Sequence, residues 1–255
     1  MVMEQRKQMP RLGGRKLLKV LEPSFPEELK VGRDTFFNFL RDRGLLIRKR
    51  RTKVYTTNSS HWLRKYDNLI KDFIPTAPGQ LWVSDITYIE IKEGFAYLSL
   101  ITDAYSRKIV GWSLGETLEA KYSISALKMA LKQRKENTNL YHHSDRGIQY
   151  CSDGYVKLLR KHDIKISMTE NGDPLENAIA ERVNGILKGE WLNDLKLKSK
   201  EQAENQIKKI IYTYNHFRPH GSINMLTPYK AHLQSGMLRR RWKNYYKNKL
   251  QTVEY

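Results

Sequence analysis

Short apolar runs mark the first half of the chain's central region. Two of them, Phe95–Ile101 and Lys108–Leu114, are rich in aromatic and β-branched residues and are joined by a polar turn that includes Ser106 and Arg107. Runs of this kind predict a β-hairpin. A similar run, Trp82–Tyr88, precedes them. The pattern therefore predicts a three-stranded antiparallel unit.

Helical and extended patterns alternate after this unit. The expected elements are a helix with apolar positions at Ala120, Ile124, Leu127 and Leu131, a strand at Leu140–Asp145, a helix near Tyr155–Leu159 and a strand at Ile164–Met168. With one more helix around residue 181, the order becomes β-β-β-α-β-α-β-α. This order predicts an α/β fold.

The last of these helices has two faces of opposite character. At 100° per residue, one face gathers apolar side chains, namely Leu175, Ile179, Val183, Ile186 and Leu187. The other carries a polar stripe made of Asn177, Glu181, Asn184 and Lys188. Most such stripes are solvated surface, and this alternative stays open for the helix taken alone.

The two ends of the chain predict further helices. Gly13–Leu21 is expected to form a short helix, and a second is expected to open at Val31–Asp34, to place Phe36, Phe37 and Leu40 on one face and to end at Gly44. Such a pair, with cations outside, suggests a helix-turn-helix-like module. Residues 201–217 predict an amphipathic helix that Pro219 stops. Its apolar face would pack on the core or on another subunit.

These patterns divide the chain into four expected parts. They are a helix-turn-helix-like, DNA-binding module at 1–51, a basic linker at 52–79, an α/β core at 80–190 and a helical, basic extension at 191–255.

Charge is distributed unevenly over the 255 residues. The net charge is +10 over residues 1–74, zero over 75–190 and +9 over 191–255, which accounts for the total of +19. A balanced core between two basic arms is typical of a protein that binds a polyanion at both ends of its active domain, although basic tails can also be merely solvated. The expected DNA contacts in the arms are Arg48, Lys49, Arg50, Arg51, Arg239, Arg240 and Arg241.

Three carboxylates occupy informative positions in the predicted core. Asp85 lies in the first strand, Asp145 ends the fourth, and Glu181 lies on the last helix with 35 residues between it and Asp145. Hard oxygen ligands hold Mg²⁺ or Mn²⁺ while leaving positions for water and phosphate oxygens. Two such ions about 4 Å apart activate a nucleophile and stabilise the leaving oxygen. Asp85, central in the sheet, would bridge them.

Each carboxylate also has an ordinary explanation. Asp145 could be a turn residue at a strand end, and Asp85 an acid on an exposed strand face. Four further acids compete with Glu181 for the third ligand position, namely Glu170, Asp173, Glu176 and Glu190. None of the four combines the spacing to Asp145 with a place in the polar stripe.

Motifs around these acids resemble those of the DDE transposases of bacterial insertion sequences, a group related to retroviral integrases. His143-Ser144-Asp145-Arg146-Gly147, followed by Gln149-Tyr150 and Ser152, resembles their second-aspartate motif, and Trp82–Tyr88 their first. The segment Asn177–Glu190 resembles their glutamate helix. Their closing motif is matched by Tyr214-Asn215, Arg218-Pro219-His220 and Thr227-Pro228.

The match has two local departures. Gly221–Met225 contains no leucine, where one is expected between His220 and the Thr-Pro pair, and Asn171–Leu175 is unusual before the glutamate helix.

The resemblance implies a ribonuclease-H-like mixed sheet in which Asp85, Asp145 and Glu181 are the catalytic, metal-binding residues and Lys188 contacts DNA. It implies DNA cleavage at the ends of a mobile element and transfer of the freed 3′-hydroxyl, at a pair of Mg²⁺ or Mn²⁺ ions. The implied partners are the terminal inverted repeats, target DNA, further copies of the chain, and an upstream-frame DNA-binding protein as partner or fusion. The resemblance also implies that the protein lies in the bacterial cytoplasm, in association with the nucleoid.

Other classes are disfavoured. A single cysteine, Cys151, excludes a disulfide framework and a His₂Cys₂ zinc module. The sequence shows neither a cleavable signal nor an apolar run of about 20 residues, which disfavours a membrane protein. Two alternatives remain open: a ribonuclease-H-like nuclease that only hydrolyses, and a transposase-derived DNA-binding protein with an inactive core.

Overall fold

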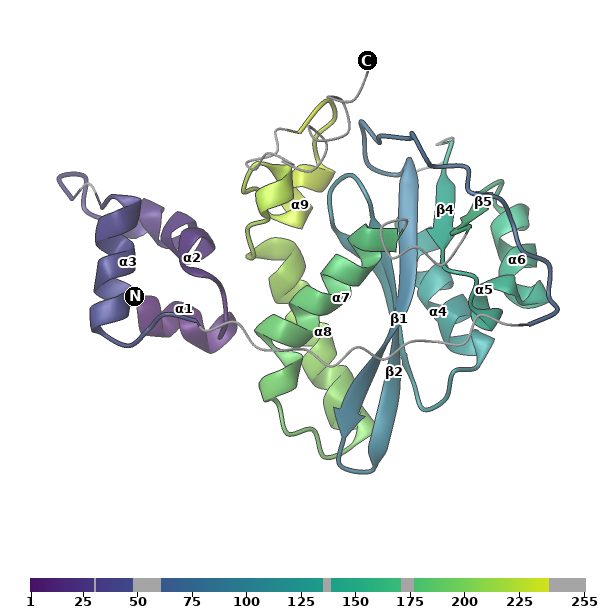
Figure 1. The fold of residues 1–255 in the computed structure, drawn as a ribbon, viewed down its shortest axis with the longest axis horizontal. Helices are drawn as coiled ribbons and strands as arrows, with labels where there is room; N and C mark the ends of the chain where they lie inside the picture. The colour runs from purple at the N-terminus through teal and green to yellow at the C-terminus, as the bar shows by residue number, and fades with distance from the viewer. Residues whose placement is uncertain (30, 48–60, 135–138, 171–176, 239–255) are drawn as a thin grey trace, which may run out of the picture.

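A five-stranded mixed sheet lies at the centre of the computed structural model, which describes residues 1–29, 31–47, 61–134, 139–170 and 177–238. The strands are β1 (Leu81–Ile91), β2 (Gly94–Asp103), β3 (Ile109–Gly115), β4 (Tyr141–Ser144) and β5 (Lys165–Met168). Their order is β3-β2-β1-β4-β5; β1, β2 and β3 pair antiparallel, whereas β4 and β5 run parallel to β1 (Figure 1). The predicted hairpin unit and the ribonuclease-H-like fold class are confirmed.

Helices cover both faces of the sheet, so that the core has three layers (Figure 1). On one face lie α4 (Ala120–Leu131), α5 (Ile148–Cys151) and α6 (Asp153–Lys161); on the other lie α7 (Ala178–Glu190) and α8 (Lys200–His216). Helix α4 approaches β3 closely at Gly111, where an added Cβ would lie 2.2 Å from the Ala126 carbonyl oxygen. A larger residue there would push α4 off the sheet.

The N-terminal helices form a small bundle beside α7 and α8 (Figure 1). They are α1 (Val2–Gln8), α2 (Gly14–Leu21) and α3 (Arg33–Asp42), with a 3₁₀ turn at Glu22–Ser24. Phe36 and Leu40 are buried, as their shared helical face predicts, and Gly44 takes a left-handed φ of 65° just after α3. Helix α1 was not predicted, because residues 2–8 carry no repeating apolar pattern.

Three contacts join this bundle to the C-terminal end of α7. Trp191 donates from Nε1 to the Gln8 carbonyl at 2.8 Å. Lys16 lies 3.8 Å from Glu190, and Arg11 lies 3.7 Å from Asp194 in the 3₁₀ turn Leu192–Asp194. The bundle is therefore tied to the helix that carries Glu181.

The C-terminal part packs on the core through one face of α8. The buried side chains of α8 include Ala203, Ile207, Ile210, Ile211 and Tyr214, which is the apolar face that the sequence predicts. Ser199 caps the start of α8, and Thr227 caps the short helix α9 (Pro228–His232), which follows a 3₁₀ turn at Gly221–Ile223. Neither α9 nor α5 was predicted, since four or five residues are too few for a helical period to show.

No helix in the described ranges has the length and apolar character to cross a bilayer.

Candidate active site

Asp85 and Asp145 lie at neighbouring positions on adjacent parallel strands. Ser84 of β1 pairs in register with Ser144 of β4, and the next residue along each strand is one of the two aspartates. Asp85 belongs to the central strand, and Asp145 follows the last residue of β4. Both side chains are half-buried. Strand pairing thus brings together two carboxylates that lie far apart in the sequence.

Hydrogen bonds fix the orientation of the Asp85 carboxylate. Its Oδ2 accepts a bond of 2.8 Å from Nδ2 of Asn184 on α7, and its Oδ1 accepts one of 2.8 Å from the Ile86 backbone N–H. Asp145 accepts a bond of 3.0 Å from the backbone N–H of Gly147. An added Cβ at Gly147 would lie 3.0 Å from Asp145 Oδ1, so a small residue is favoured there.

The site concentrates negative charge. Burial, the charge of Asp145 and, to a smaller extent, that of Glu181 raise the pKa of Asp85 to about 7, while the bonds from Asn184 and Ile86 oppose this shift. Carboxylates gathered in this way destabilise one another's ionised forms. A bound cation would remove the penalty, so the electrostatics of the site suit a divalent metal ion.

Glu181 lies on α7, on the edge of the helix that faces these aspartates. In the same stripe, Asn177 is buried and donates to the Ser84 carbonyl at 3.0 Å, and Asn184 is buried against Asp85. For these two asparagines the solvated-face alternative is wrong. Glu181 itself is exposed, and its charge acts on Asp85.

The donor set fits Mg²⁺ or Mn²⁺ better than a closed structural metal. Among the residues that the structure describes, no three His, Cys, Asp or Glu side chains gather closely enough to hold an ion by themselves. Mg²⁺ usually takes one or two carboxylates and completes its shell with water and substrate phosphate. Asp85 and Asp145 are two carboxylates on neighbouring strands, and Glu181 lies on α7.

Two of the rival acids have other partners. Glu190 accepts from Nε and Nη2 of Arg218 at 2.7 and 2.6 Å, and Glu170 pairs with Lys71 at 2.7 Å. Both are therefore engaged in ion pairs of their own. Asp173 and Glu176 lie outside the described residues.

Lys188 is half-buried, one turn beyond Asn184 in the same stripe. Burial lowers its pKa, and the charge of Asp85 opposes that shift, which places the ammonium within electrostatic reach of the site. Its side chain lines a pocket of about 400 Å³ together with Tyr88 and Glu90 of β1. The other expected DNA contacts, namely Arg48, Lys49, Arg50, Arg51, Arg239, Arg240 and Arg241, lie outside the described residues.

A buried hydrogen-bond network links β1 and β4 to α6. His142 Nε2 lies 2.7 Å from Ser84 Oγ and 2.8 Å from the hydroxyl of Tyr155 on α6. Burial and the neighbouring His143 lower the pKa of His142 to about 3, so its ring is neutral at ordinary pH. His142 packs within its strand, and its partners Ser84 and Tyr155 carry no signal in the sequence pattern.

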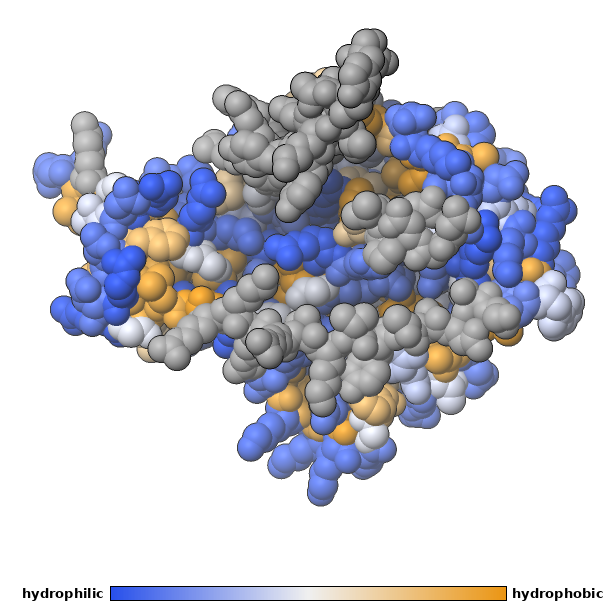
Figure 2. Space-filling view, in the orientation of Figure 1, coloured by the Kyte–Doolittle hydropathy of each residue, from blue (hydrophilic) through white to orange (hydrophobic). Residues whose placement is uncertain are grey.

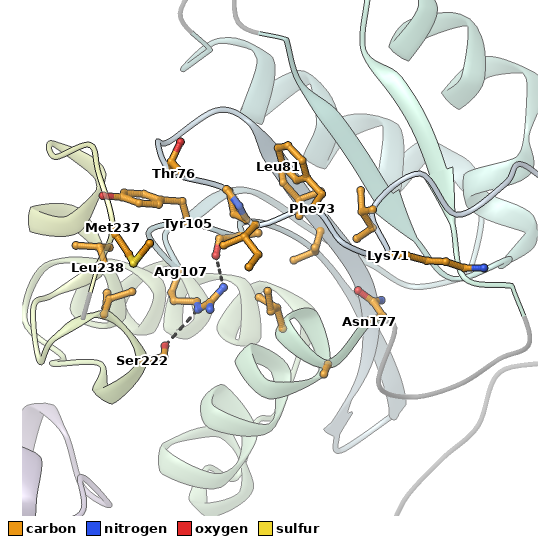
Figure 3. Close-up of a pocket in the computed structure, with 18 of the residues that line it drawn as sticks. Lys71, Phe73, Thr76, Leu81, Tyr105, Arg107, Asn177, Ser222, Met237 and Leu238 are labelled. Carbon is orange, nitrogen blue, oxygen red and sulfur yellow. Dashed lines mark hydrogen bonds between the residues drawn. The ribbon is translucent and has the colours of Figure 1, made fainter. Parts of the chain in front are cut away.

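A groove of about 920 Å³ begins beside Asn177, and the carboxylates lie outside it. Its lining is mainly apolar and includes Phe73, Leu81 and Ile179, with Lys71 and Arg107 as charged members. Figure 3 shows Asn177 and Lys71 at one end and Met237 and Leu238 at the other. The candidate site formed by the carboxylates therefore lies where β1 pairs with β4, and not in this groove.

Comparisons with protein families agree with this geometry. Two models described as integrase core domain match residues 75–174 and 162–228. The chain is 36% identical over 200 residues to the insertion element IS600 31 kDa protein of Shigella sonnei, covering 78% of this chain and 74% of that protein. It is 35% identical over 191 residues to transposase InsF for insertion sequence IS3A of Escherichia coli, covering 74% of this chain and 66% of InsF.

Solved structures show the same fold. The simian T-cell lymphotropic virus intasome matches with a TM-score of 0.55 at 15% identity, over 96% of this chain and 79% of that one. The catalytic core domain of HTLV-2 integrase in complex with magnesium matches with a TM-score of 0.50 at 22% identity, over 62% of this chain and 99% of that one.

Proposed function

The chain belongs to the insertion-sequence transposases that carry an integrase core domain, and from this premise we propose that Asp85, Asp145 and Glu181 are its catalytic, metal-binding residues. As a transposase, it is a polynucleotidyl transferase that cleaves DNA strands and joins them to new sites. The observation that carries the residue assignment is the register of β1 and β4, which sets Asp85 beside Asp145 under the polar stripe of α7.

We propose that these side chains hold Mg²⁺ or Mn²⁺ in the family's usual pair, with Asp85 shared between the ions. When bound, such ions supply Lewis acidity that activates the attacking oxygen and stabilises the leaving one. Asn184 holds the Asp85 carboxylate in one orientation. Lys188 is positioned to contact a DNA phosphate next to the one that reacts.

The two proposed reactions share one phosphoryl-transfer geometry. In cleavage, a water oxygen forms a bond to phosphorus as the P–O3′ bond breaks, and the leaving oxygen takes a proton to become a free 3′-hydroxyl. In joining, that 3′-oxygen attacks a second phosphodiester, loses its proton, and displaces another 3′-oxygen. The same residues can therefore serve both reactions, which differ in whether water or a 3′-hydroxyl is the nucleophile.

The DNA partners follow from the same proposal. We infer that the chain acts on the terminal inverted repeats of its element and on target DNA, as a homo-oligomer assembled on DNA, with a nucleoid location in a bacterium. The basic arms at 1–74 and 191–255 support this because Lys and Arg displace counterions condensed on DNA. Figure 2 shows hydrophilic side chains over much of the face seen in Figure 1. An upstream-frame protein as partner or fusion stays part of the proposal.

An oligonucleotide assay tests the assignment. The substrate would be a labelled duplex that carries an element end, incubated with Mg²⁺ and an unlabelled target duplex. Asp85→Asn, Asp145→Asn and Glu181→Gln should each abolish cleavage and joining while DNA affinity is retained, because each removes a ligand without shrinking the side chain. Glu93→Gln is the matched control, since Glu93 is exposed in the turn between β1 and β2, eight residues beyond Asp85.

The outcomes separate the alternatives. Cleavage without joined products would favour a hydrolytic nuclease, and binding without Mg²⁺-dependent nicking would favour an inactive DNA-binding relative. Full activity of Glu181→Gln, or full activity in excess EDTA, would contradict the metal-site assignment.

A further inference from the structure

Four aromatic rings lie together on the outer surface of the C-terminal part. Tyr212 and His216 are one turn apart on α8, with ring centroids 4.5 Å apart and planes 32° apart. His216 in turn stacks on Tyr229 of α9, at 4.4 Å and 34°. Phe217 meets the edge of Tyr212 at 5.9 Å. These four rings are called the aromatic row below.

The aromatic row is exposed. Tyr212 is 58% exposed, Phe217 48% and Tyr229 40%, and the neighbouring Leu233 is 71% exposed. Helix α8 already buries its opposite face in the core, so the row does not contribute to that packing. Single exposed aromatic residues are ordinary, but a contiguous group of them marks a binding surface.

The surroundings of the row are basic. The sequence has no Asp or Glu from Asn205 to Leu238. Lys208 and Lys209 lie on the exposed face of α8 about one turn before Tyr212, and Lys230 follows Tyr229. Burial and the charge of Lys108 lower the pKa of His216, which keeps the middle ring neutral at ordinary pH. The surface therefore combines exposed aromatic rings with three exposed lysines.

We propose that the aromatic row binds unpaired nucleotides of a DNA strand, with bases extending the stack on Tyr212 and Tyr229 and phosphates held by Lys208, Lys209 and Lys230. Aromatic platforms edged by cations are the general means of binding single strands, because every base offers a π-face. A duplex hides its base faces and offers only phosphates to the lysines. The preference for unpaired nucleotides is thus the distinguishing property of the site.

This inference rests on the proposed function only in taking DNA as the substrate. Cleavage and joining of strands leave unpaired nucleotides at the junctions, and a site that holds them would lie apart from the metal-binding carboxylates. The row belongs to α8 and α9, whereas Asp85 and Asp145 belong to β1 and the end of β4.

Binding measurements with the full chain test the site. The background would be Glu181→Gln in EDTA, so that DNA stays intact, and the probes would be labelled oligothymidine of about 15 nucleotides and a duplex of equal length, followed by fluorescence anisotropy. The double variant Tyr212→Ala/Tyr229→Ala should weaken single-strand binding by roughly tenfold or more. Duplex affinity should stay within about twofold, since the lysine contacts remain.

Two controls accompany it. Tyr212→Phe/Tyr229→Phe keeps the rings and should bind the single strand like the parent. Met129→Ala truncates another exposed apolar side chain, on α4 across the sheet, and should change neither affinity. Photocrosslinking of a 5-iodouracil strand should label the peptide that contains Tyr212 or the one that contains Tyr229.

Several results would overturn the proposal. Unchanged single-strand affinity in the alanine variant, or equal loss for both probes, would do so. A change in oligomeric state on light scattering with single-strand affinity intact would make the row a contact between copies instead. None of these outcomes depends on strand cleavage, so failure of the carboxylate assignment and failure of this inference are distinguishable.

Discussion

Asn184 on α7 donates a hydrogen bond of 2.8 Å from its Nδ2 to Oδ2 of Asp85 on β1. This bond joins the helix that carries Glu181 to the strand that carries the central aspartate. Outer partners of metal-binding carboxylates orient them, and their loss typically costs 10–100-fold in metal affinity or activity.

Asn184→Ala should therefore lower cleavage by roughly 10- to 100-fold and raise the Mg²⁺ concentration needed for half-maximal rate, because Asp85 loses its orientation. Asn205→Ala, at an exposed position on α8, is the matched control. Rate against Mg²⁺ concentration measures the effect. If the two variants show the same metal dependence, the bond has no role in placing Asp85.

Asp85 should also destabilise the metal-free protein at neutral and alkaline pH. Its folded pKa of about 7 lies above the ordinary 3.8. Between these values the folded state holds a proton that the unfolded state has lost, so stability falls as pH rises through this window and the penalty is complete above pH 7.

Asp85→Asn removes that penalty. In EDTA at pH 8 the variant should be more stable than the parent by up to about 4 kcal/mol, with the difference disappearing near pH 4. Added Mg²⁺ should stabilise the parent and leave the variant unchanged. Urea unfolding across this pH range measures both effects. A gap between the two proteins that stays constant from pH 4 to pH 8 would refute the linkage.

Much of the fold follows from the sequence, because strands and helices longer than one period leave a readable pattern. That Asp85 lies in a strand and that Asp145 ends one follows too, whereas the pairing of β1 with β4 that brings the two together is seen only in the structure. The contact of Asn184 with Asp85 does not follow, because it depends on how α7 crosses the sheet.

Glu190 illustrates a second limit of sequence reasoning. It is a rival metal ligand by residue type, and its partner Arg218 is 28 residues further along the chain. Only the packing of α8 against α7 brings the two together. The order of elements could thus be predicted, whereas partners supplied by helix packing could not.

The Glu190–Arg218 pair should stabilise the protein strongly against loss of either partner. Arg218 is fully buried and makes two charge-assisted bonds to Glu190. Glu190→Gln should reduce the free energy of unfolding by about 3–5 kcal/mol, because it leaves a buried guanidinium uncompensated. Glu22→Gln, in the exposed pair with Lys19, should cost less than about 1 kcal/mol.

A double-mutant cycle separates pairing from packing. If Glu190→Gln and Arg218→Met are coupled through the buried bridge, the double variant should lose less stability than the two single variants together. Additive losses would mean that each side chain acts through its own packing. Chemical denaturation of the four proteins provides the measurement.

Lys188 should contact substrate DNA without contributing to the fold. Lys188 lies one turn beyond Asn184 and the charge of Asp85 acts on its ammonium, so we expect it to contact a phosphate adjacent to the reacting one. Lys188→Ala should slow cleavage at sub-saturating DNA and make the salt dependence of binding shallower by about one unit of slope. Lys157→Ala, exposed on α6 across the sheet, should change neither quantity. If the kinetics and the salt slope equal those of the parent, Lys188 does not contact DNA. It then only lines the pocket beside β1, with its ammonium solvated.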